Sequence, residues 1–224
     1  MKGGAARPRA VLLDFGGTLD ADGIAWKDRF QRLFAAAGAP DGNGFDRAFY
    51  DADDALVGAI AQEATFSEVV GRLSAAVARR IGLREEAGLV AARFLGDARA
   101  CLGRNLPVLA RLHERYRLAV VSNFYGNLAA VCAETGLSAH LDAAIDSVVV
   151  GAEKPDRRIF DAALDALGVA PEEALFVGDS LPRDMAGARA VGIPHVWLRP
   201  GEGSACCPED AVIASLPELG RVLA

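Results

Sequence analysis

The stretch AVLLDFGGTLD, residues 10–20, decides the fold: an apolar run ends in Asp14, and Gly16, Gly17 and Thr18 follow at once. This pattern predicts a buried strand that delivers a carboxylate into a tight turn. Glycines let backbone N–H groups approach an anion, and a carboxylate can attack phosphorus or bind magnesium. The stretch therefore indicates phosphate chemistry at Asp14.

Three later segments end apolar runs in polar residues, as the first one does. They are LAVVSN, which ends at Ser122 and Asn123, GAEKPD, which contains Lys154, and ALFVGDSLPRD, which contains Asp179 and Asp184. A hydroxyl group can hydrogen-bond a phosphoryl oxygen, an ammonium group acts as a point charge, and carboxylates bind hard cations. The order of the four motifs therefore predicts a phosphoryl-binding site.

From residue 106 onward, strand-like apolar runs alternate with helix-like segments. The runs are LAVVSN, AIDSVVV, ALFVGD and HVWL, and AVIAS and LPELGRVL form the tail. Continuous apolar strands that alternate with helices predict an α/β fold with a doubly wound, mostly parallel sheet. Ligands of such sheets bind beyond the carboxyl ends of the strands, so we expect the polar residues above to meet at one edge.

The segment between the first two strands differs in character. From about residue 23 to residue 103 it is rich in alanine, with apolar residues at three- and four-residue spacing and no strand-like run. We expect four helices, with breaks at residues 38–40, near residues 64–65 and at Gly82. Thr65 and Glu68 predict a capping box at one helix start.

The four motifs together resemble the haloacid dehalogenase superfamily, and the resemblance covers nearly the whole chain. It implies a Rossmann-like α/β core, formed by residues 1–20 and 105–224, and an inserted all-helical cap of the C1 type at residues 21–104. It also implies a magnesium-dependent phosphatase that acts on a small phosphorylated metabolite through an aspartyl-phosphate intermediate. The cap is expected to close over the site and exclude water.

The resemblance gives each motif a role. Asp14 is expected to be the nucleophile and a magnesium ligand, and the other residues expected to take part in catalysis are Ser122, Lys154 and Asp184. Asp184 would hold Lys154 or a metal-bound water.

A second set of residues is expected to bind the substrate or the Mg²⁺ ion. Asn123 and the turn residues Gly17 and Thr18 are the expected substrate contacts. The expected metal ligands, besides Asp14, are the side chain of Asp179 and the backbone carbonyl of Gly16.

One position departs from the superfamily pattern: the second residue after the nucleophile, usually an aspartate that serves as general acid/base, is Gly16. The leaving group could need little protonation, or Asp20 or Asp22 could stand in for the missing acid. Alternatively, the protein could bind a phosphorylated ligand or a protein partner with little turnover. A fourth interpretation is a dehalogenase or a phosphonatase, the latter with Lys27 as its Schiff-base lysine.

Composition narrows the function classes. The 224 residues carry a net charge of −6 and are 52% hydrophobic, which suits a globular enzyme and argues against a nucleic-acid partner. No apolar run approaches the roughly 20 residues of a membrane span. The four cysteines lack a CxxC spacing and favour the cytoplasm; we expect Cys101 and Cys132 in helix cores and Cys206–Cys207 in a loop. Oligomeric state and the identity of the substrate are left open.

Overall fold

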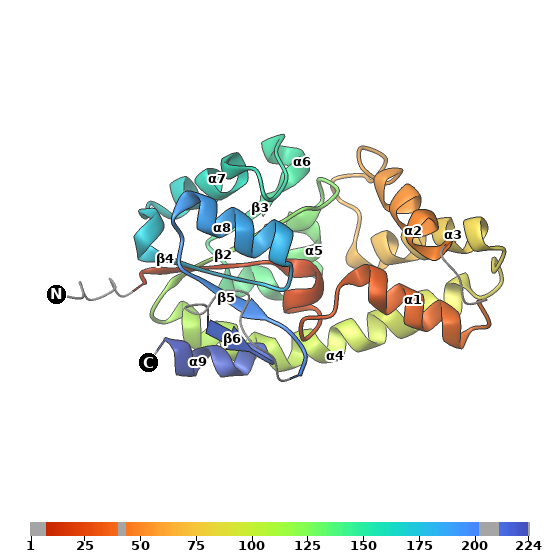
Figure 1. Cartoon of the computed structure of the whole chain (residues 1–224), viewed down its shortest axis with the longest axis horizontal. Helices are drawn as coiled ribbons and strands as arrows, with labels where there is room; N and C mark the ends of the chain where they lie inside the picture. Colours follow the sequence, from red (N-terminus) through yellow and green to blue (C-terminus); the bar gives the residue numbers. More distant parts are fainter. Residues whose placement is uncertain (1–7, 40–43, 202–210, 224) are drawn as a thin grey trace.

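The computed structural model describes residues 8–39, 44–201 and 211–223. Its centre is a six-stranded sheet in the order β3-β2-β1-β4-β5-β6, with every neighbouring pair parallel (Figure 1). The strands are β1 (Ala10–Leu13), β2 (Arg117–Ser122), β3 (Ala143–Asp146), β4 (Ala174–Gly178), β5 (His195–Leu198) and β6 (Ala211–Ile213). Because β1 pairs with both β2 and β4, the sheet grows outward in both directions from its first strand, which confirms the predicted doubly wound fold.

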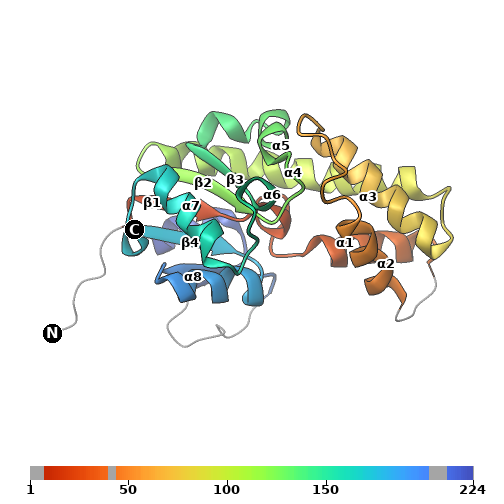
Figure 2. The same cartoon turned by 90° about the horizontal axis from the view of Figure 1, so that it is seen from above.

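Both faces of the sheet are covered, which explains why its strands are apolar without alternation. On one face, Leu12 of β1 packs in a cluster with α7 (Arg157–Leu167) and α8 (Ala186–Val191). On the other, Leu13 packs in a cluster with α4 (Ala87–His113), α5 (Leu128–Glu134) and α9 (Leu219–Val222). Figure 2 shows α4 and α5 on the opposite side of the sheet from α8. The shorter helical turns are Phe15–Leu19, Leu137–His140, Pro171–Glu173, Leu181–Met185 and Leu216–Glu218.

The insert between β1 and β2 contains helices and no strand in its described part, as predicted. It contains α1 (Trp26–Ala36), α2 (Gly44–Asp54), α3 (Phe66–Ile81) and the first part of α4, which extend away from the sheet in Figure 1. The predicted capping box is present at the start of α3, where Glu68 N–H donates to Thr65 Oγ1 and Thr65 N–H donates to the Glu68 carboxylate. Gly82 ends α3 with a φ of 80°.

Helix α4 is a single helix from Ala87 to His113 that runs from the insert to the sheet (Figure 1). The predicted end of the helical segment at residue 103 is therefore too early by ten positions. Gly103 and Pro107 both lie inside the helix, and packing of Leu109 against the sheet cluster holds the helix together across them. None of the helices in the described ranges is long and apolar enough to cross a bilayer.

One segment predicted to be a strand is a strand only in its first half and a helix in its second. The run AIDSVVV was expected to be extended, but β3 ends at Asp146 and α6 (Ser147–Val150) follows immediately. The Asp146 carboxylate accepts a hydrogen bond from Val148 N at 2.9 Å and so caps the helix, which a β-branched run alone does not reveal.

The cysteines agree with expectation where the structure describes them. Cys101 and Cys132 are buried in α4 and α5 as free thiols. Cys206 and Cys207 lie outside the described residues, so their assignment to a loop stays a prediction.

Candidate active site

The carboxyl ends of β1, β2 and β4 meet at one edge of the sheet and bring three predicted residues together. Asp14 follows β1, Ser122 ends β2 and Asp179 follows β4. Pairing between β1 and β4 holds these strand ends side by side, because Asp14 N–H donates to Val177 O of β4 at 2.9 Å. The side chains of Asp14 and Ser122 are buried, at 5% and 2% exposure.

Lys154 joins two of the acids. Its Nζ lies 2.6 Å from Asp14 Oδ1 and 2.7 Å from Asp184 Oδ1, and only 3% of the lysine side chain is exposed. Burial alone would lower the pKa of Lys154, but the two carboxylates outweigh it and raise that pKa above its usual value. The side chain is therefore an ammonium group fixed between the expected nucleophile and a second acid.

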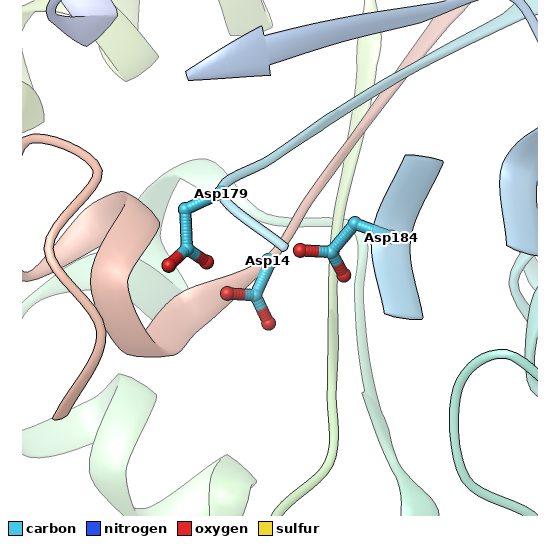
Figure 3. A group of neighbouring side chains, drawn as sticks. All are labelled: Asp14, Asp179 and Asp184. Atoms are coloured by element: carbon cyan, nitrogen blue, oxygen red, sulfur yellow. The ribbon is translucent and has the colours of Figure 1, made fainter. Parts of the chain in front are cut away.

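Asp14, Asp179 and Asp184 point toward one another (Figure 3). One carboxylate oxygen from each lies within 4.8 Å of the others, close enough to share one cation. Burial, and then the charges of Asp14 and Asp184, raise the pKa of Asp179 to about 8. Such a concentration of negative charge and hard oxygen donors fits a divalent ion such as Mg²⁺.

Hydrogen bonds hold the residues that flank the nucleophile. Ser122 Oγ donates to Asp14 Oδ1 at 3.3 Å. The side-chain amide of Asn123 pairs with the backbone of Lys154: Lys154 N donates to Asn123 Oδ1 at 2.7 Å, and Asn123 Nδ2 donates to Lys154 O at 3.1 Å. Asn123 thus positions the lysine loop, and both Ser122 and Asn123 line the cleft described below.

The turn after Asp14 supports Asp179. Thr18 is fully buried and its hydroxyl donates to Asp179 Oδ1 at 3.5 Å. A Cβ at Gly17 would lie 2.5 Å from Asp179 Oδ2, and the residue has a φ of 95°, so only glycine fits. Neither Gly17 nor Thr18 is among the described residues that line the cleft, whereas Gly16 is. Direct substrate contact by this pair, and a metal contact by the Gly16 carbonyl, stay predictions.

The space beside Gly16 is occupied by an indole ring. A Cβ at Gly16 would lie 3.2 Å from Trp26 Nε1 and 3.4 Å from Trp26 Cδ1. A carboxylate side chain at this position would therefore have to move the ring.

Asp20, a residue considered as a substitute acid, instead holds that ring. Its buried carboxylate accepts hydrogen bonds from Gly17 N at 2.7 Å, from Trp26 Nε1 at 2.8 Å and from Arg29 Nη1 at 2.6 Å. Burial raises the pKa of Asp20, and Arg29 opposes that shift most strongly. Asp22, the other residue considered, pairs with Arg104 at 2.6 Å. Within the described chain, neither acid is part of the cleft lining.

A cleft of about 920 Å³ lies between the sheet edge and the helical insert. From the sheet side it is lined by Asp14 and its neighbours, and from the insert by aromatic and charged side chains: Trp26, Lys27, Asp28, Phe49, Tyr50, Asp53 and Asp54. The Tyr125 hydroxyl donates to Asp53 Oδ1 and links the two sides. Burial raises the pKa of both groups.

Aromatic and arginine side chains of the insert take different places. Trp26 and Tyr50 line the cleft, but Arg29 is buried against Asp20, and Arg47 is exposed and pairs with Asp51. These outcomes depend on which side of each helix faces the cleft.

Lys27 lies in the cleft lining and pairs with acids of the insert. Its Nζ is 2.8 Å from Asp28 Oδ1 and 3.2 Å from Asp46 Oδ1. The hydrogen bond to Asp28 is the main reason that the pKa of Lys27 is raised. A Schiff-base lysine needs a lowered pKa, so the environment of Lys27 does not favour the phosphonatase interpretation.

Asp53 and Tyr125 escaped the sequence interpretation. Asp53 belongs to the run DADD, which resembles a solvated helix face, and Tyr125 lies in a loop after β2. Only the position of Tyr125, three residues after Ser122, hinted that it would lie near the site.

Comparison with known proteins agrees with this fold. A family model described as haloacid dehalogenase-like hydrolase matches residues 8–192. Among solved structures, a hydrolase of the same superfamily from Bacillus subtilis, crystallised bound to magnesium, superposes with a TM-score of 0.58 at 21% identity, covering 97% of this chain and 99% of that one. A phosphatase from Thermococcus onnurineus gives a TM-score of 0.56 at 25% identity, covering 96% and 98%.

Curated relatives match shorter segments. The phosphoserine phosphatase of Thermus thermophilus is 48% identical over 66 residues, which are 30% of this chain and 26% of that protein. The glyceraldehyde 3-phosphate phosphatase of Methanopyrus kandleri is 34% identical over 132 residues, which are 55% of this chain and 57% of that protein. In both cases the chain spans less than two thirds of the relative's own length.

Proposed function

Because this chain belongs to the haloacid dehalogenase-like hydrolase family, we propose that it is a magnesium-dependent phosphatase acting on a small phosphorylated metabolite. The phosphatase names of two partial relatives support phosphate-ester hydrolysis. The observation that carries the proposal is the position of Lys154 Nζ, 2.6 Å from Asp14 and 2.7 Å from Asp184 at the wall of the cleft. A carboxylate, a fixed ammonium group and further acids together suit attack on a phosphate.

Asp14 is the nucleophile in this proposal. Within the described chain, Ser122 and Lys154 both donate to Oδ1 of Asp14, and no residue donates to Oδ2. One carboxylate oxygen is therefore oriented by its neighbours, and the other is available to phosphorus or to a cation. Attack forms an aspartyl-phosphate, which water then hydrolyses to release phosphate and restore the carboxylate.

The remaining residues orient and neutralise charge. The Lys154 ammonium group offsets charge on the phosphoryl oxygens, and Asp184 keeps that group in place. The Ser122 hydroxyl is positioned to hydrogen-bond the phosphoryl group once it has bound. Asp14 and Asp179 would hold magnesium, with Asp184 close enough to join them. When bound, magnesium supplies positive charge that stabilises the negative charge of the phosphoryl group.

We further propose that residues 1–20 and 105–224 form the catalytic core and residues 21–104 the specificity cap. The cleft supports this division, because Asp14 and Lys154 line it from the sheet while Tyr50 and Asp53 line it from the insert. The boundary near residue 104 falls within α4, which would connect the two parts rigidly. The net charge of −6 supports a small-molecule partner over nucleic acid, and a cytoplasmic location stays a prediction.

The test is phosphate release from a panel of sugar phosphates, nucleotides and acyl phosphates, with and without Mg²⁺. We expect release from at least one substrate, and we expect its loss when EDTA removes the metal. Absence of magnesium-dependent turnover across the panel would contradict the proposal. Halide release from 2-haloacids, measured in parallel, would instead support a dehalogenase.

A further inference from the structure

The wall that faces the nucleophile across the cleft is aromatic where it meets Gly16. The indole of Trp26 touches the position that a Cβ of residue 16 would take, and both residues line the cleft. The indole edge, rather than a titratable side chain, therefore fills the space next to the turn that carries Asp14.

The ring is held from several sides. Its centroid lies 6.5 Å from that of Phe15, 5.9 Å from Phe66, 5.2 Å from Phe94 and 6.0 Å from Phe124. Centroid separations of about 4.5–7 Å are typical of packed aromatic pairs. Trp26 is therefore packed against the turn after β1, the loop after β2, and helices α3 and α4.

The polar groups beneath the ring are already engaged. Trp26 Nε1 donates to Asp20, whose carboxylate also accepts from Gly17 N and from Arg29. The two oxygens of Asp20 thus accept from three donors, one of them a guanidinium group. Neither the indole N–H nor Asp20 is therefore free to protonate a leaving group.

In-line displacement expels the leaving group on the side of phosphorus away from the attacking oxygen. Asp14 attacks from the sheet edge, so the leaving group departs toward the insert wall that contains Trp26. A general acid has to lie within about 3 Å of the leaving oxygen, directly or through one water. An indole edge whose N–H is already donated cannot fill that role.

We infer that Trp26 is a specificity-determining residue that confines the enzyme to phosphates whose leaving group departs as an anion. This inference rests on the phosphatase activity proposed above. In the first step a bond forms between an Asp14 oxygen and phosphorus, and the bond from phosphorus to the leaving oxygen breaks. Its electron pair stays on that oxygen, which takes a proton from water after departure. Acyl, anomeric, enol and aryl phosphates belong to this class, and simple alkyl phosphates do not.

The test is kcat/KM for a series of ring-substituted phenyl phosphates, which differ in leaving-group basicity but little in shape. This parameter reports the steps up to departure of the phenol, even where hydrolysis of the aspartyl-phosphate limits kcat. A general acid speeds departure of a basic leaving group by about 10²–10⁴-fold. Without one, the more basic phenol leaves more slowly, so kcat/KM should fall by about 10²-fold or more from 4-nitrophenyl to phenyl phosphate.

A kcat/KM that changes less than about tenfold across the series would overturn the inference while leaving the phosphatase proposal intact. A series in which no member releases phosphate, under conditions where the metabolite panel also fails, would overturn the proposed function and the inference with it.

Variants at the two contacting positions supply a second measurement. Gly16→Asp alone should lower kcat/KM for every member, because its Cβ would lie 3.2 Å from Trp26 Nε1 and the indole would have to shift. In the double variant with Trp26→Ala, the same carboxylate gains room to protonate the leaving group. The ratio of kcat/KM for phenyl phosphate to kcat/KM for 4-nitrophenyl phosphate should then rise about tenfold or more. Leu89→Ala, an exposed change on α4, is the control for an altered insert. If kcat/KM in Gly16→Asp with Trp26 intact no longer depends on the basicity of the leaving group, that result would contradict the inference.

Among the described residues of the insert, three acids, Asp28, Asp53 and Asp54, also line the cleft, and Asp28 is paired with Lys27. Asp53 is the one of them that reaches across to Tyr125. It already accepts from the Tyr125 hydroxyl, so Asp53→Asn should leave the slope of the wild-type series unchanged. A selective loss on phenyl phosphate in this variant would identify Asp53 as the general acid and overturn the inference. Thermal melts of each variant confirm folding, and the wild-type series decides the question where a variant does not fold.

Discussion

The two walls of the cleft are built from opposite kinds of side chain. On the sheet side, Asp14, Asp184 and Lys154 are buried charged groups in direct contact. On the insert side, next to Gly16, Trp26 lies among phenylalanine rings and its polar atom is already bonded. The buried charged groups of the sheet edge are thus accompanied by an indole ring, and not by a carboxylate, beside Gly16.

In the proposed mechanism, the two walls serve separate halves of a phosphoryl transfer. Attack and charge neutralisation would depend on the sheet edge, whose geometry follows from strand ends and loop positions. Departure of the leaving group would depend on the insert, whose residues reach the cleft only through helix packing. Variants that change one wall at a time show whether the other is affected.

The largest effect is expected on the charged wall, from Asp14→Asn. The amide is a poor nucleophile, so phosphate release should fall by at least about 10³-fold while the fold is kept. Steady-state kinetics on the best substrate measure it, and Asp97→Asn, an exposed change on α4, is the control. Retention of the wild-type rate in Asp14→Asn would exclude this residue as the nucleophile.

The next effect is expected on the aromatic wall, from Asp20→Ala. The Asp20 side chain is fully buried and Arg29 is 9% exposed, so removal of the acid leaves a buried guanidinium group unpaired. The free energy of unfolding should fall by about 3–5 kcal/mol in denaturant titrations. Asp22→Ala breaks a pair whose side chains are 56% and 33% exposed and should cost less than about 1 kcal/mol. Equal losses in the two variants would contradict the assigned role of Asp20.

A smaller effect is expected on the charged wall, where Asp179 should make the stability of the protein depend on pH. The pKa of Asp179 is about 8 in the folded protein against 3.8 for the free side chain, so the folded state binds its proton more tightly. Between these values, stability of the metal-free protein should fall as pH rises. Its melting temperature should therefore be several degrees lower at about pH 8 than at about pH 5.

Asp179→Asn should flatten that dependence and also reduce stabilisation by Mg²⁺. Asp165→Asn, an exposed change on α7, should leave the pH profile as it is. Scanning calorimetry with and without Mg²⁺ measures both effects. An unchanged slope in Asp179→Asn would show that another group titrates.

The smallest effect concerns the link between the walls, in Tyr125→Phe. The change removes the hydroxyl that donates to Asp53 and leaves the ring in place. A single hydrogen bond contributes about 1 kcal/mol, so the free energy of unfolding should fall by about that amount, and KM should rise by up to about fivefold through a looser cleft. Kinetics with saturating and limiting substrate separate KM from kcat. A loss of about 10²-fold in kcat would instead assign the hydroxyl a direct role.

The sequence predicted the charged wall far better than the aromatic one. Strand-terminal positions locate Asp14, Ser122 and Asp179, because parallel strands carry their carboxyl ends to one edge. Lys154 followed from its motif. The position of Trp26 beside Gly16 could not be predicted, since it depends on how α1 leaves the turn after β1.

Other errors have local causes. Helix α4 passes through Gly103 and Pro107, which resemble helix ends in sequence but are held by packing on both sides. The predicted strand through residue 150 stops at Asp146, because its carboxylate caps a helix. In both cases a tertiary or side-chain contact outweighs the local pattern.

Attack of Asp14 on phosphorus at the charged edge of the sheet can be examined in a crystal structure with Mg²⁺ and beryllium fluoride. We expect the fluoride complex on an Asp14 carboxylate oxygen, contacted by Lys154 and Ser122, with the metal ion between Asp14 and Asp179. Beryllium fluoride bound elsewhere, or a metal ion that Asp14 and Asp179 do not share, would contradict this mechanism.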